Sequence, residues 1–343
     1  RRLAKDNPQA YEPDVAQTLN NLAILYSDTQ RLEESETLYL EALEIRRRLA
    51  KDNPQTYELD VAITLNNLAA LYYETQRLDE SETMYLEALE IRRRLAKDTP
   101  QAYEPYVALT LNNLAFLYYN TQRLEESETL YQEALETYRR LAKDNPQTYE
   151  PDVAQTLSNL GLLHLQLEQY NEALSSFDEA LPIYRMLSQN NPAYGNSFVA
   201  CLYFLTQLYP MTEEHSKYYE VNEEWLPIVR MLSEEDAENY MEEYVNALGN
   251  QSFQCIFMGK FSQSEQYASE AIGIDGTKTF VYTNLAAALL FQGKYDEAEQ
   301  VYRQYKDELK DSFLQDFQDY EEAGVIPTER KADVERIKKM LNE

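Results

Sequence analysis

The string RRLAKDNP stands at Arg1 and Arg47, recurs as RRLAKDTP at Arg93, and returns unchanged at Arg139, so the step is 46 residues each time. A second string keeps this step and reads LNNLAILY, LNNLAALY, LNNLAFLY and LSNLGLLH from Leu19, Leu65, Leu111 and Leu157. Self-similarity at a fixed period of about 20–50 residues is typical of solenoids built from stacked structural units. The first half of the chain is therefore predicted to be such a stack.

Each unit carries two helical patterns. In the first unit Val15, Leu19 and Leu22 follow one another at helical spacing. After a polar break, a second apolar stripe runs over residues 32–45. An Asn-Pro pair, as at Pro8, separates one unit from the next. Two short helices cannot bury their apolar faces alone, so stacked pairs with a continuous core are expected.

The second half keeps the architecture with a shorter period. GKFSQSEQYASEAI begins at Gly259 and GKYDEAEQVYRQYK at Gly293, 34 residues later. One more helix is expected at 307–323, and an amphipathic capping helix at 328–343. The prediction is an all-α, right-handed α-solenoid of about seven stacked antiparallel helix pairs with a C-terminal capping helix. Its predicted parts are regular repeats at 1–190, a degenerate repeat at 191–240, two 34-residue repeats at 241–306 and capping helices at 307–343.

The net charge argues against several classes of partner. Lysine and arginine number 31 against 60 aspartates and glutamates, which gives a formal charge of −29. A surface this acidic repels phosphate backbones and anionic lipids, so neither nucleic acid nor a membrane surface is an expected partner. The acidity suits the solubility of a long body, and it also suits a basic partner.

The sequence offers few groups for catalysis or metal binding. The two cysteines, Cys201 and Cys255, form no disulfide framework and have no metal-ligand spacing. His164 takes the repeat position of Tyr26 and is expected to be a buried structural residue, whereas His215 is expected to face solvent. No glycine-rich phosphate loop is present. We therefore expect no enzyme activity, no cofactor and no metal, and without an export signal a cytoplasmic location.

Arginine clusters at 46–48, 92–94 and 139–140 close the second helix of three units. They could form a basic binding ladder. Because glutamates lie beside them and cations favour the negative end of a helix, helix termination and pairing within the chain is the preferred interpretation.

The pattern resembles the tetratricopeptide repeat, and LNNLAxLY with EALEIR is most similar to the kinesin light chain variety. Small residues stand where that variety brings helices together, at Ala23, Ala69, Ala115, Gly161, Ser35, Ser81, Ser127, Ala173, Ala42, Ala88, Ala134 and Ala180. One departure is clear: glutamine or glutamate replaces the usual glycine of the turn, which raises the possibility of a changed turn geometry.

The resemblance implies that the first helix of each pair lines a concave groove, in which matching asparagines contact a bound peptide. Asn20, Asn66 and Asn112 form such a ladder, which Ser158 interrupts. An amide both donates and accepts hydrogen bonds, so it suits a peptide main chain. The alternative is that these asparagines only bind neighbouring helices, a role we assign to the second asparagine of each pair.

Aromatic and apolar residues accompany the ladder. They are Tyr73, Phe116, Tyr119, Leu162 and Leu165. None of the twenty expected groove positions is lysine or arginine, whereas the family often uses basic groove residues to hold acidic motifs. The expected ligand is therefore a neutral or basic protein segment with apolar side chains.

The favoured function is a non-catalytic scaffold that binds a peptide or helix of a partner in its groove. The main alternative is a sensor or regulatory module of a larger signalling protein whose effector domain lies upstream of residue 1. A self-associating structural element is a third possibility. We also expect the first helix to expose apolar surface from Val15 and Leu22, ready to contact a preceding repeat.

Overall fold

The computed structural model describes residues 1–343, with only the side chain of Leu3 outside the description. The described residues are almost wholly helical and contain no strand. Seven antiparallel helix pairs and a final helix follow one another, which confirms the predicted all-α solenoid architecture. The chain divides into two compact units, Arg1–Leu187 (unit 1) and Ser188–Glu343 (unit 2), and each is described by itself.

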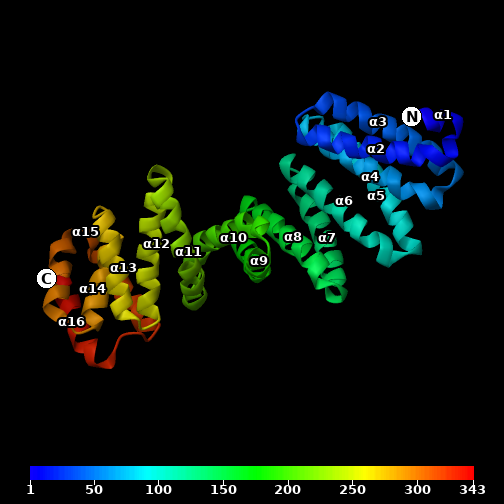
Figure 1. Cartoon of the computed structure of the whole chain (residues 1–343). Coiled ribbons are helices and arrows are strands. Elements are labelled where there is room, and N and C mark those ends of the chain that lie inside the picture. The colour runs from blue at the N-terminus through cyan, green and yellow to red at the C-terminus, as the bar shows by residue number, and fades with distance from the viewer. The chain divides into compact units, whose positions relative to one another are not determined.

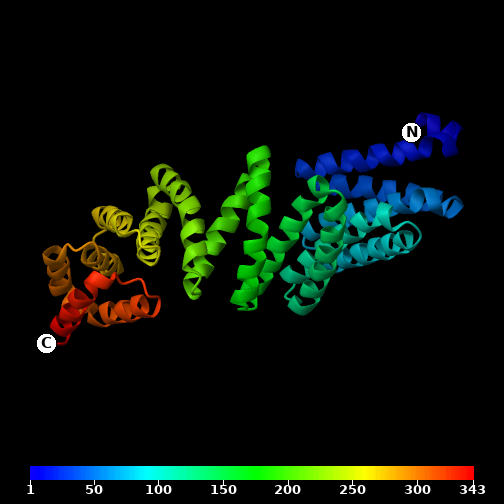
Figure 2. The ribbon, with the colours of Figure 1, turned by 90° about the horizontal axis from the view of Figure 1, so that it is seen from below.

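Within each unit, successive helices pack side by side (Figures 1 and 2). The helices of unit 1 are α1 (Arg2–Asp6), α2 (Pro8–Asp28), α3 (Leu32–Asp52), α4 (Pro54–Glu74), α5 (Leu78–Asp98), α6 (Pro100–Asn120), α7 (Leu124–Asp144), α8 (Pro146–Gln166) and α9 (Tyr170–Asn190), the last of which runs on past Leu187. Those of unit 2 are α10 (Gly195–Leu208), α11 (His215–Glu235), α12 (Ala237–Phe257), α13 (Phe261–Ile274), α14 (Phe280–Phe291), α15 (Tyr295–Glu322) and α16 (Lys331–Asn342), with 3₁₀ turns at Pro192–Tyr194, Tyr209–Met211 and Thr328–Arg330. Of the helices described, none has both the length and the apolar character that crossing a bilayer requires.

Helix boundaries follow from local chemistry. Proline is the first residue of α2, α4, α6 and α8, where its missing N–H costs nothing. The residue before it is the N-cap, and in two of the four helices its side chain caps the backbone: Asn7 and Asn145 accept bonds from the backbone N–H of Ala10 and Thr148.

The turn inside each pair keeps the same geometry although the glycine is missing in unit 1. A left-handed φ of 57–63° occurs at Gln30, Gln76, Gln122 and Glu168, and one of 68° and 84° at Gly259 and Gly293. The turn residue donates back three residues and the next residue back five, as in Gln76 N–H to Tyr73 O (3.0 Å) and Arg77 N–H to Tyr72 O (2.8 Å). The glutamine therefore changes the strain of this turn and not its shape.

The small residues stand at helix contacts, as expected. All twelve are buried, and three serines among them also form hydrogen bonds between the two helices of a pair. The hydroxyl of Ser35 donates to the Ala23 carbonyl oxygen at 2.8 Å, and the same bond recurs in the next two repeats, Ser81 to Ala69 and Ser127 to Ala115. At Gly161 an added Cβ would lie 2.7 Å from the ring of Phe177, so alanine would force this ring to move.

Most clustered arginines pair within the chain, which confirms the preferred interpretation for them. Arg47 and the arginines equivalent to it bind a glutamate of the next repeat: Arg47–Glu87, Arg93–Glu133 and Arg139–Glu179, at 2.5–2.6 Å. Arg48 and the arginines equivalent to it bind a glutamate of the first helix of the same pair: Arg48–Glu12, Arg94–Glu58 and Arg140–Glu104, at 2.5–2.8 Å. Arg46 and Arg92 also bind within the chain, but through buried hydrogen bonds between repeats and not through an ion pair with a glutamate.

The C-terminal part of unit 2 differs from the expected boundaries. Residues 307–322 do not form a separate helix but continue α15, which starts at Tyr295. The ring centroids of Tyr302 and Phe313 are 4.7 Å apart, whereas eleven residues of straight helix would separate their Cα atoms by about 16 Å. Helix α15 therefore bends sharply and folds back. The capping prediction is confirmed, since Val334, Ile337, Met340 and Leu341 of α16 are all buried.

Candidate peptide-binding groove

The left-handed turn residue sets a common register for the first helix of each pair. The ladder position lies ten residues before it, at Asn20, Asn66, Asn112 and Ser158 in unit 1 and at Gly249 and Thr283 in unit 2. The face of these helices that carries the ladder position is called the inner face below. Corresponding inner-face residues of the two units can then be compared one by one.

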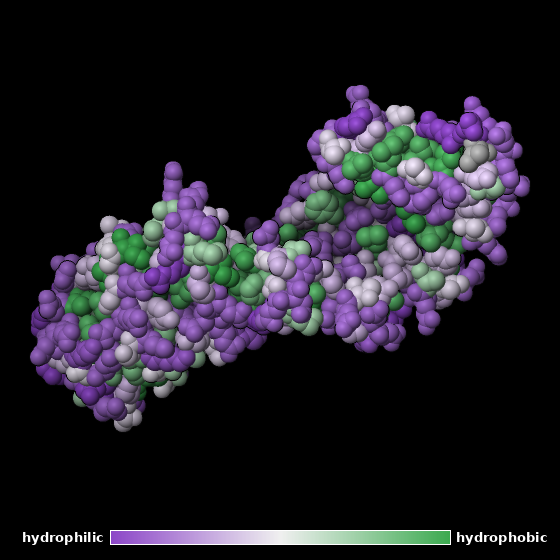
Figure 3. Space-filling view, in the orientation of Figure 1, coloured by the Kyte–Doolittle hydropathy of each residue, from purple (hydrophilic) through white to green (hydrophobic). Residues whose placement is uncertain are grey.

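A hollow of about 380 Å³ lies on the inner face of unit 1. Helices α4, α5, α6 and α8 line it, with Ala70, Tyr73, Glu74, Tyr85, Asn112, Asn113, Phe116, Leu117, Gln155 and Asn159. The lining contains one carboxylate, no lysine and no arginine. Figure 3 shows patches of hydrophobic residues on a mainly hydrophilic surface, including the hollowed face of unit 1.

An aromatic pair forms one wall of the hollow. The rings of Tyr73 and Phe116 meet edge to face with centroids 5.5 Å apart. Phe116 keeps 43% of its surface exposed. Tyr85 closes the hollow from the second helix of its pair, and burial raises the pKa of this phenol well above its ordinary value, so it stays neutral. A ring held in place by another ring and still exposed is suited to contact an apolar side chain of a ligand.

The ladder amides do not all face this hollow. Asn20 is buried, and Asn66 is only 7% exposed, with its Oδ1 accepting from Arg92, Thr110 and Asn113 at 3.3–3.5 Å. Asn112 is half-buried and lines the hollow. Asn20 and Asn66 thus serve contacts between repeats, which is the alternative that the sequence left open for them.

The second asparagine of each pair joins neighbouring repeats and lines the hollow as well. Its Nδ2 donates to the first asparagine of the preceding repeat, at the long distances of 3.4–3.5 Å, in Asn67 to Asn20, Asn113 to Asn66 and Asn159 to Asn112. Asn113 and Asn159 also belong to the lining. The assignment of a purely structural role to this residue was too narrow, because the amide plane reaches both the next repeat and the hollow.

A buried guanidinium lies behind the ladder. Arg92 is 1% exposed, and its Nη1 donates to the Tyr106 carbonyl oxygen at 3.0 Å and to the Thr110 hydroxyl. In the preceding repeat, Arg46 is the equivalent of Arg92, and its Nη2 also donates to the side-chain oxygen of Gln17 at 2.7 Å. Beside Arg92 the equivalent of Gln17 is Ile63, which cannot accept such a bond. Burial lowers the pKa of Arg92 to about 10, so it remains charged at neutral pH. It organises the repeat contact and does not reach a ligand.

Family models agree with this architecture. Models described as tetratricopeptide repeat match residues 15–55 and 61–100, 106–186, and 280–304, which together make up more than half of the chain. The chain belongs to the tetratricopeptide repeat family. None of the curated proteins compared with it matches.

Several solved structures are similar to this tetratricopeptide protein at low sequence identity. A putative kinesin light chain with nearly identical repeats from Podosopora anserina is 15% identical, covers 65% of this chain and 98% of its own, and has a TM-score of 0.49. BtubC from P. vanneervenii is 22% identical, with coverage of 72% and 91% and a TM-score of 0.45. A Signal Transduction ATPase with Numerous Domains with a tetratricopeptide repeat sensor, from Pyrococcus horikoshii, is 18% identical over 99% of this chain and 47% of its own, with a TM-score of 0.47.

The hollow brings together only part of the predicted set. Tyr73, Asn112 and Phe116 line it, whereas Tyr119, Leu162 and Leu165 are half-buried and stand outside the lining. Gln155 of α8 lines it as well. Tyr85 was missed because it belongs to a second helix, which the family pattern does not place in the groove.

The histidines were predicted with mixed success. His164 is buried, as expected, with its Nε2 3.5 Å from Glu128. His215 does not simply face solvent. Its ring stacks on Phe257 with centroids 3.6 Å apart, and its Nδ1 lies 2.9 Å from the Gln254 side-chain oxygen. The start of α11 packs on the end of α12, which brings this polar helix opening into contact with aromatic residues.

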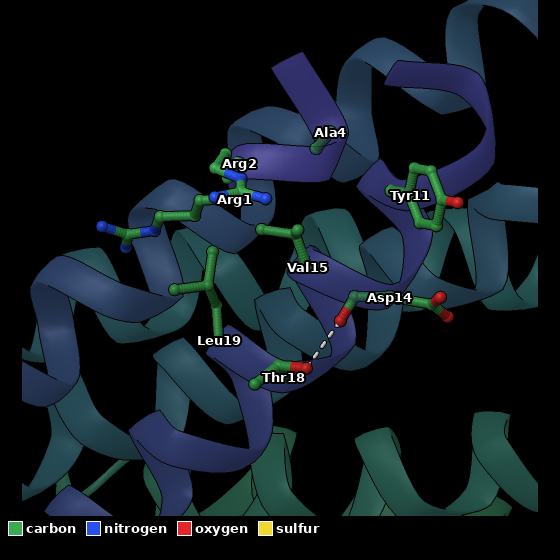
Figure 4. A pocket seen from close by; sticks show the side chains of 8 residues that line it. All are labelled: Arg1, Arg2, Ala4, Tyr11, Asp14, Val15, Thr18 and Leu19. Carbon is green, nitrogen blue, oxygen red and sulfur yellow. Dashed lines mark hydrogen bonds between the residues drawn. The ribbon is translucent and has the colours of Figure 1, made fainter. Parts of the chain in front are cut away.

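A second hollow, of about 610 Å³, lies beside α1 and α2 and is lined by Arg1, Arg2, Ala4, Tyr11, Asp14, Val15, Thr18 and Leu19 (Figure 4). The corresponding surface of the next repeat is covered by the preceding helix pair. Leu25 is 55% exposed, for example, whereas its equivalent Leu71 is 2% exposed. Helix α2 thus exposes apolar surface at Leu25, whereas Val15 and Leu22, the residues named in the expectation, are half-buried, and what this surface contacts stays a prediction.

Proposed function

We propose that this tetratricopeptide protein is a non-catalytic interaction scaffold that holds a segment of a partner protein on the inner face of unit 1. One observation carries the proposal: the hollow beside the Tyr73–Phe116 pair, in which the ring of Phe116 stays exposed. Its volume, about 380 Å³, is within the usual range of ligand sites. An exposed aromatic anchor beside such a hollow is typical of the centre of a binding surface.

The amides of the hollow favour a peptide main chain as part of the ligand. The Oδ1 of Asn112 already accepts from Thr156 and Asn159, at 3.3 and 3.4 Å. Its NH₂ has no acceptor among the described residues and can donate to a ligand carbonyl. In the next repeat Gln155 donates to the Oδ1 of Asn159, but the residue equivalent to Gln155 beside Asn113 is Leu109, which cannot donate. The Oδ1 of Asn113 therefore has no donor within the described chain and can accept a ligand N–H. One donor and one acceptor on adjacent residues match the alternating groups of an extended chain.

Charge narrows the class of partner. The groups that line the hollow are apolar, neutral polar or, at Glu74, acidic. Glu74 is exposed and binds only the Ser27 hydroxyl, at 3.3 Å. An acidic ligand would lie against this carboxylate on a chain of net charge −29. A neutral or basic segment with apolar side chains is therefore the proposed ligand.

Selection from a random linear peptide library on the whole chain tests the proposal. We expect selected peptides to be apolar and neutral or basic. In calorimetry, Phe116→Ala should weaken the best peptide more than about tenfold, and Asn112→Ala by about two- to tenfold. The matched control is Leu86→Ala on α5, since Leu86 is 45% exposed but lies outside the hollow. Acidic selected peptides, or equal loss in the Leu86 and Phe116 variants, would refute the proposal.

A further inference from the structure

The inner face of unit 2 contains a different site. A hollow of about 390 Å³ is lined by Gly249, Asn250 and Phe253 of α12, by Thr279, Phe280, Thr283 and Asn284 at the start of α14, and by Leu309, Ser312 and Asp316 of α15. Three elements thus enclose it, with the folded-back half of α15 as one side. Its lining contains a single charged group, Asp316.

That carboxylate lacks a counter-charge. The Oδ2 atom of Asp316 is buried and has no hydrogen-bond partner, and no lysine, arginine or histidine of the described chain lies within ion-pair distance of it. Charged and titratable groups that face it come from α15 itself: Asp319, Tyr302 and Tyr320. The residues that α12 and α14 contribute to the lining are uncharged. A buried carboxylate oxygen without a hydrogen-bond donor is costly, and a bound cation would reduce that cost.

We propose that this hollow binds an alkylammonium group, with Asp316 as the counter-ion. The remaining lining fits such a group. An ammonium carries three donors, and Asn250 and Ser312 contribute side-chain oxygens to the same lining as the carboxylate. Phe253 and Phe280 contribute aromatic rings, which attract cations, and Leu309 contributes apolar surface for an alkyl stem. A single carboxylate among aromatic rings is a poor site for Mg²⁺ or Ca²⁺, which require several oxygen ligands.

Protonation should regulate this binding. Burial, assisted by Asp319 and opposed by Thr283, raises the pKa of Asp316 to about 6. Only the ionised carboxylate neutralises the cation, and an alkylammonium keeps its proton up to a pH of about 10. Affinity should therefore rise by about tenfold between pH 5 and pH 7 and then stay level to about pH 9.

The test is a ligand-observed NMR titration of the whole chain with n-butylammonium chloride at constant ionic strength. Asp316→Asn, which keeps the shape of the side chain, should weaken binding by about ten- to a hundredfold. The matched control is Asp311→Asn, which removes the same charge from an exposed position of the same helix. n-Pentanol, of similar size but neutral, should bind at least about tenfold more weakly than the ammonium. Equal binding by the Asp316 and Asp311 variants, or by the alcohol and the ammonium, would overturn the proposal.

A second arm distinguishes the source of the ammonium group. N-acetyl-lysine methylamide carries the same group on a peptide main chain. If it binds at least as tightly as n-butylammonium and competes with it, the natural ligand class includes lysine side chains. If N-acetyl-lysine methylamide does not bind while n-butylammonium does, the natural ligands are small free amines. Failure of both probes would refute this site and would leave the groove of unit 1 untouched.

Discussion

Phe116 of unit 1 and Phe253 of unit 2 occupy the same register, six residues before the left-handed turn residue of their helices. Phe116 is 43% exposed and borders an open hollow. Phe253 is partly buried, because Tyr320 of α15 lies against it with ring centroids 6.2 Å apart. The same inner-face position is thus open in one unit and covered in the other.

What covers the inner face of unit 2 is the folded-back half of α15. Leu309, Phe313, Phe317 and Tyr320 lie in one cluster with residues of α12 and α14. The rings of Phe257 and Phe291 meet Tyr320 at 5.4 and 5.6 Å. The comparison teaches that repeat register alone does not make a binding groove. In unit 2 the returning half of α15 covers the aromatic position and lines a separate hollow beside it.

The largest expected effect is on the free energy of unfolding, which should depend much more on Phe317 of the covering helix than on Phe116 of the open groove. Phe317→Ala should cost about 3–5 kcal/mol of the free energy of unfolding of unit 2, because Phe317 is fully buried. Phe116→Ala should change that of unit 1 by less than about 0.5 kcal/mol.

The single tryptophan makes this measurable. Trp225 lies on α11 in unit 2, so its fluorescence in urea follows that unit, while circular dichroism follows both. A Phe317 variant with an unchanged Trp225 transition would show that the folded-back helix does not stabilise unit 2.

The next effect concerns the carboxylate that this covering helix brings into unit 2. The pKa of Asp316 is about 6 in the folded state, against about 3.9 when unfolded. The folded state therefore holds more protons between these values, and stability falls as pH rises from about 4 to 6 and stays reduced above. Asp316→Asn should raise the free energy of unfolding by about 1–3 kcal/mol at pH 8 and change it little at pH 4. Urea titrations followed by Trp225 at pH 4, 6 and 8 would check this, with Asp311→Asn as the control that should keep the wild-type slope.

The architecture was predictable because the repeats are nearly identical, so the same amphipathic pattern recurs several times along the chain. The bend of α15 was not. Residues 295–322 contain neither proline nor glycine, so no local signal marks it. It arises from the burial of Phe313 and Phe317 against Tyr302, and such contacts between distant residues leave no periodic trace.

The sequence indicated the first helices that line the hollow of unit 1, but not which of their asparagines reach it. The ladder position and the position 26 residues after it do not change in the same step along the repeats, which read Asn66 with Arg92, Asn112 with Tyr138 and Ser158 with Tyr184. Their contact therefore left no signal in the sequence. Burial of Asn66 depends on how closely α4 and α6 approach, which the spacing of one helix does not specify.

The smallest effect concerns the turn that defines the register itself. Gln76 and Gly259 occupy equivalent turns with φ of 61° and 68°, and both are followed by the same five-residue backbone bond, Arg77 to Tyr72 and Lys260 to Cys255. A side chain in this conformation costs about 1–2 kcal/mol, while glycine loses about 0.4–1 kcal/mol through the freedom of the unfolded chain. Gln76→Gly should therefore stabilise unit 1 by about 0.5–1 kcal/mol, and Gly259→Gln should destabilise unit 2 by a similar amount, since open space beside Gly259 leaves backbone strain as the cost. Thermal unfolding by circular dichroism reports the first change and Trp225 fluorescence the second. Two changes of the same sign would mean that the side chain of Gln76 contributes a contact that outweighs the strain, and the two units would then hold their common turn by different means.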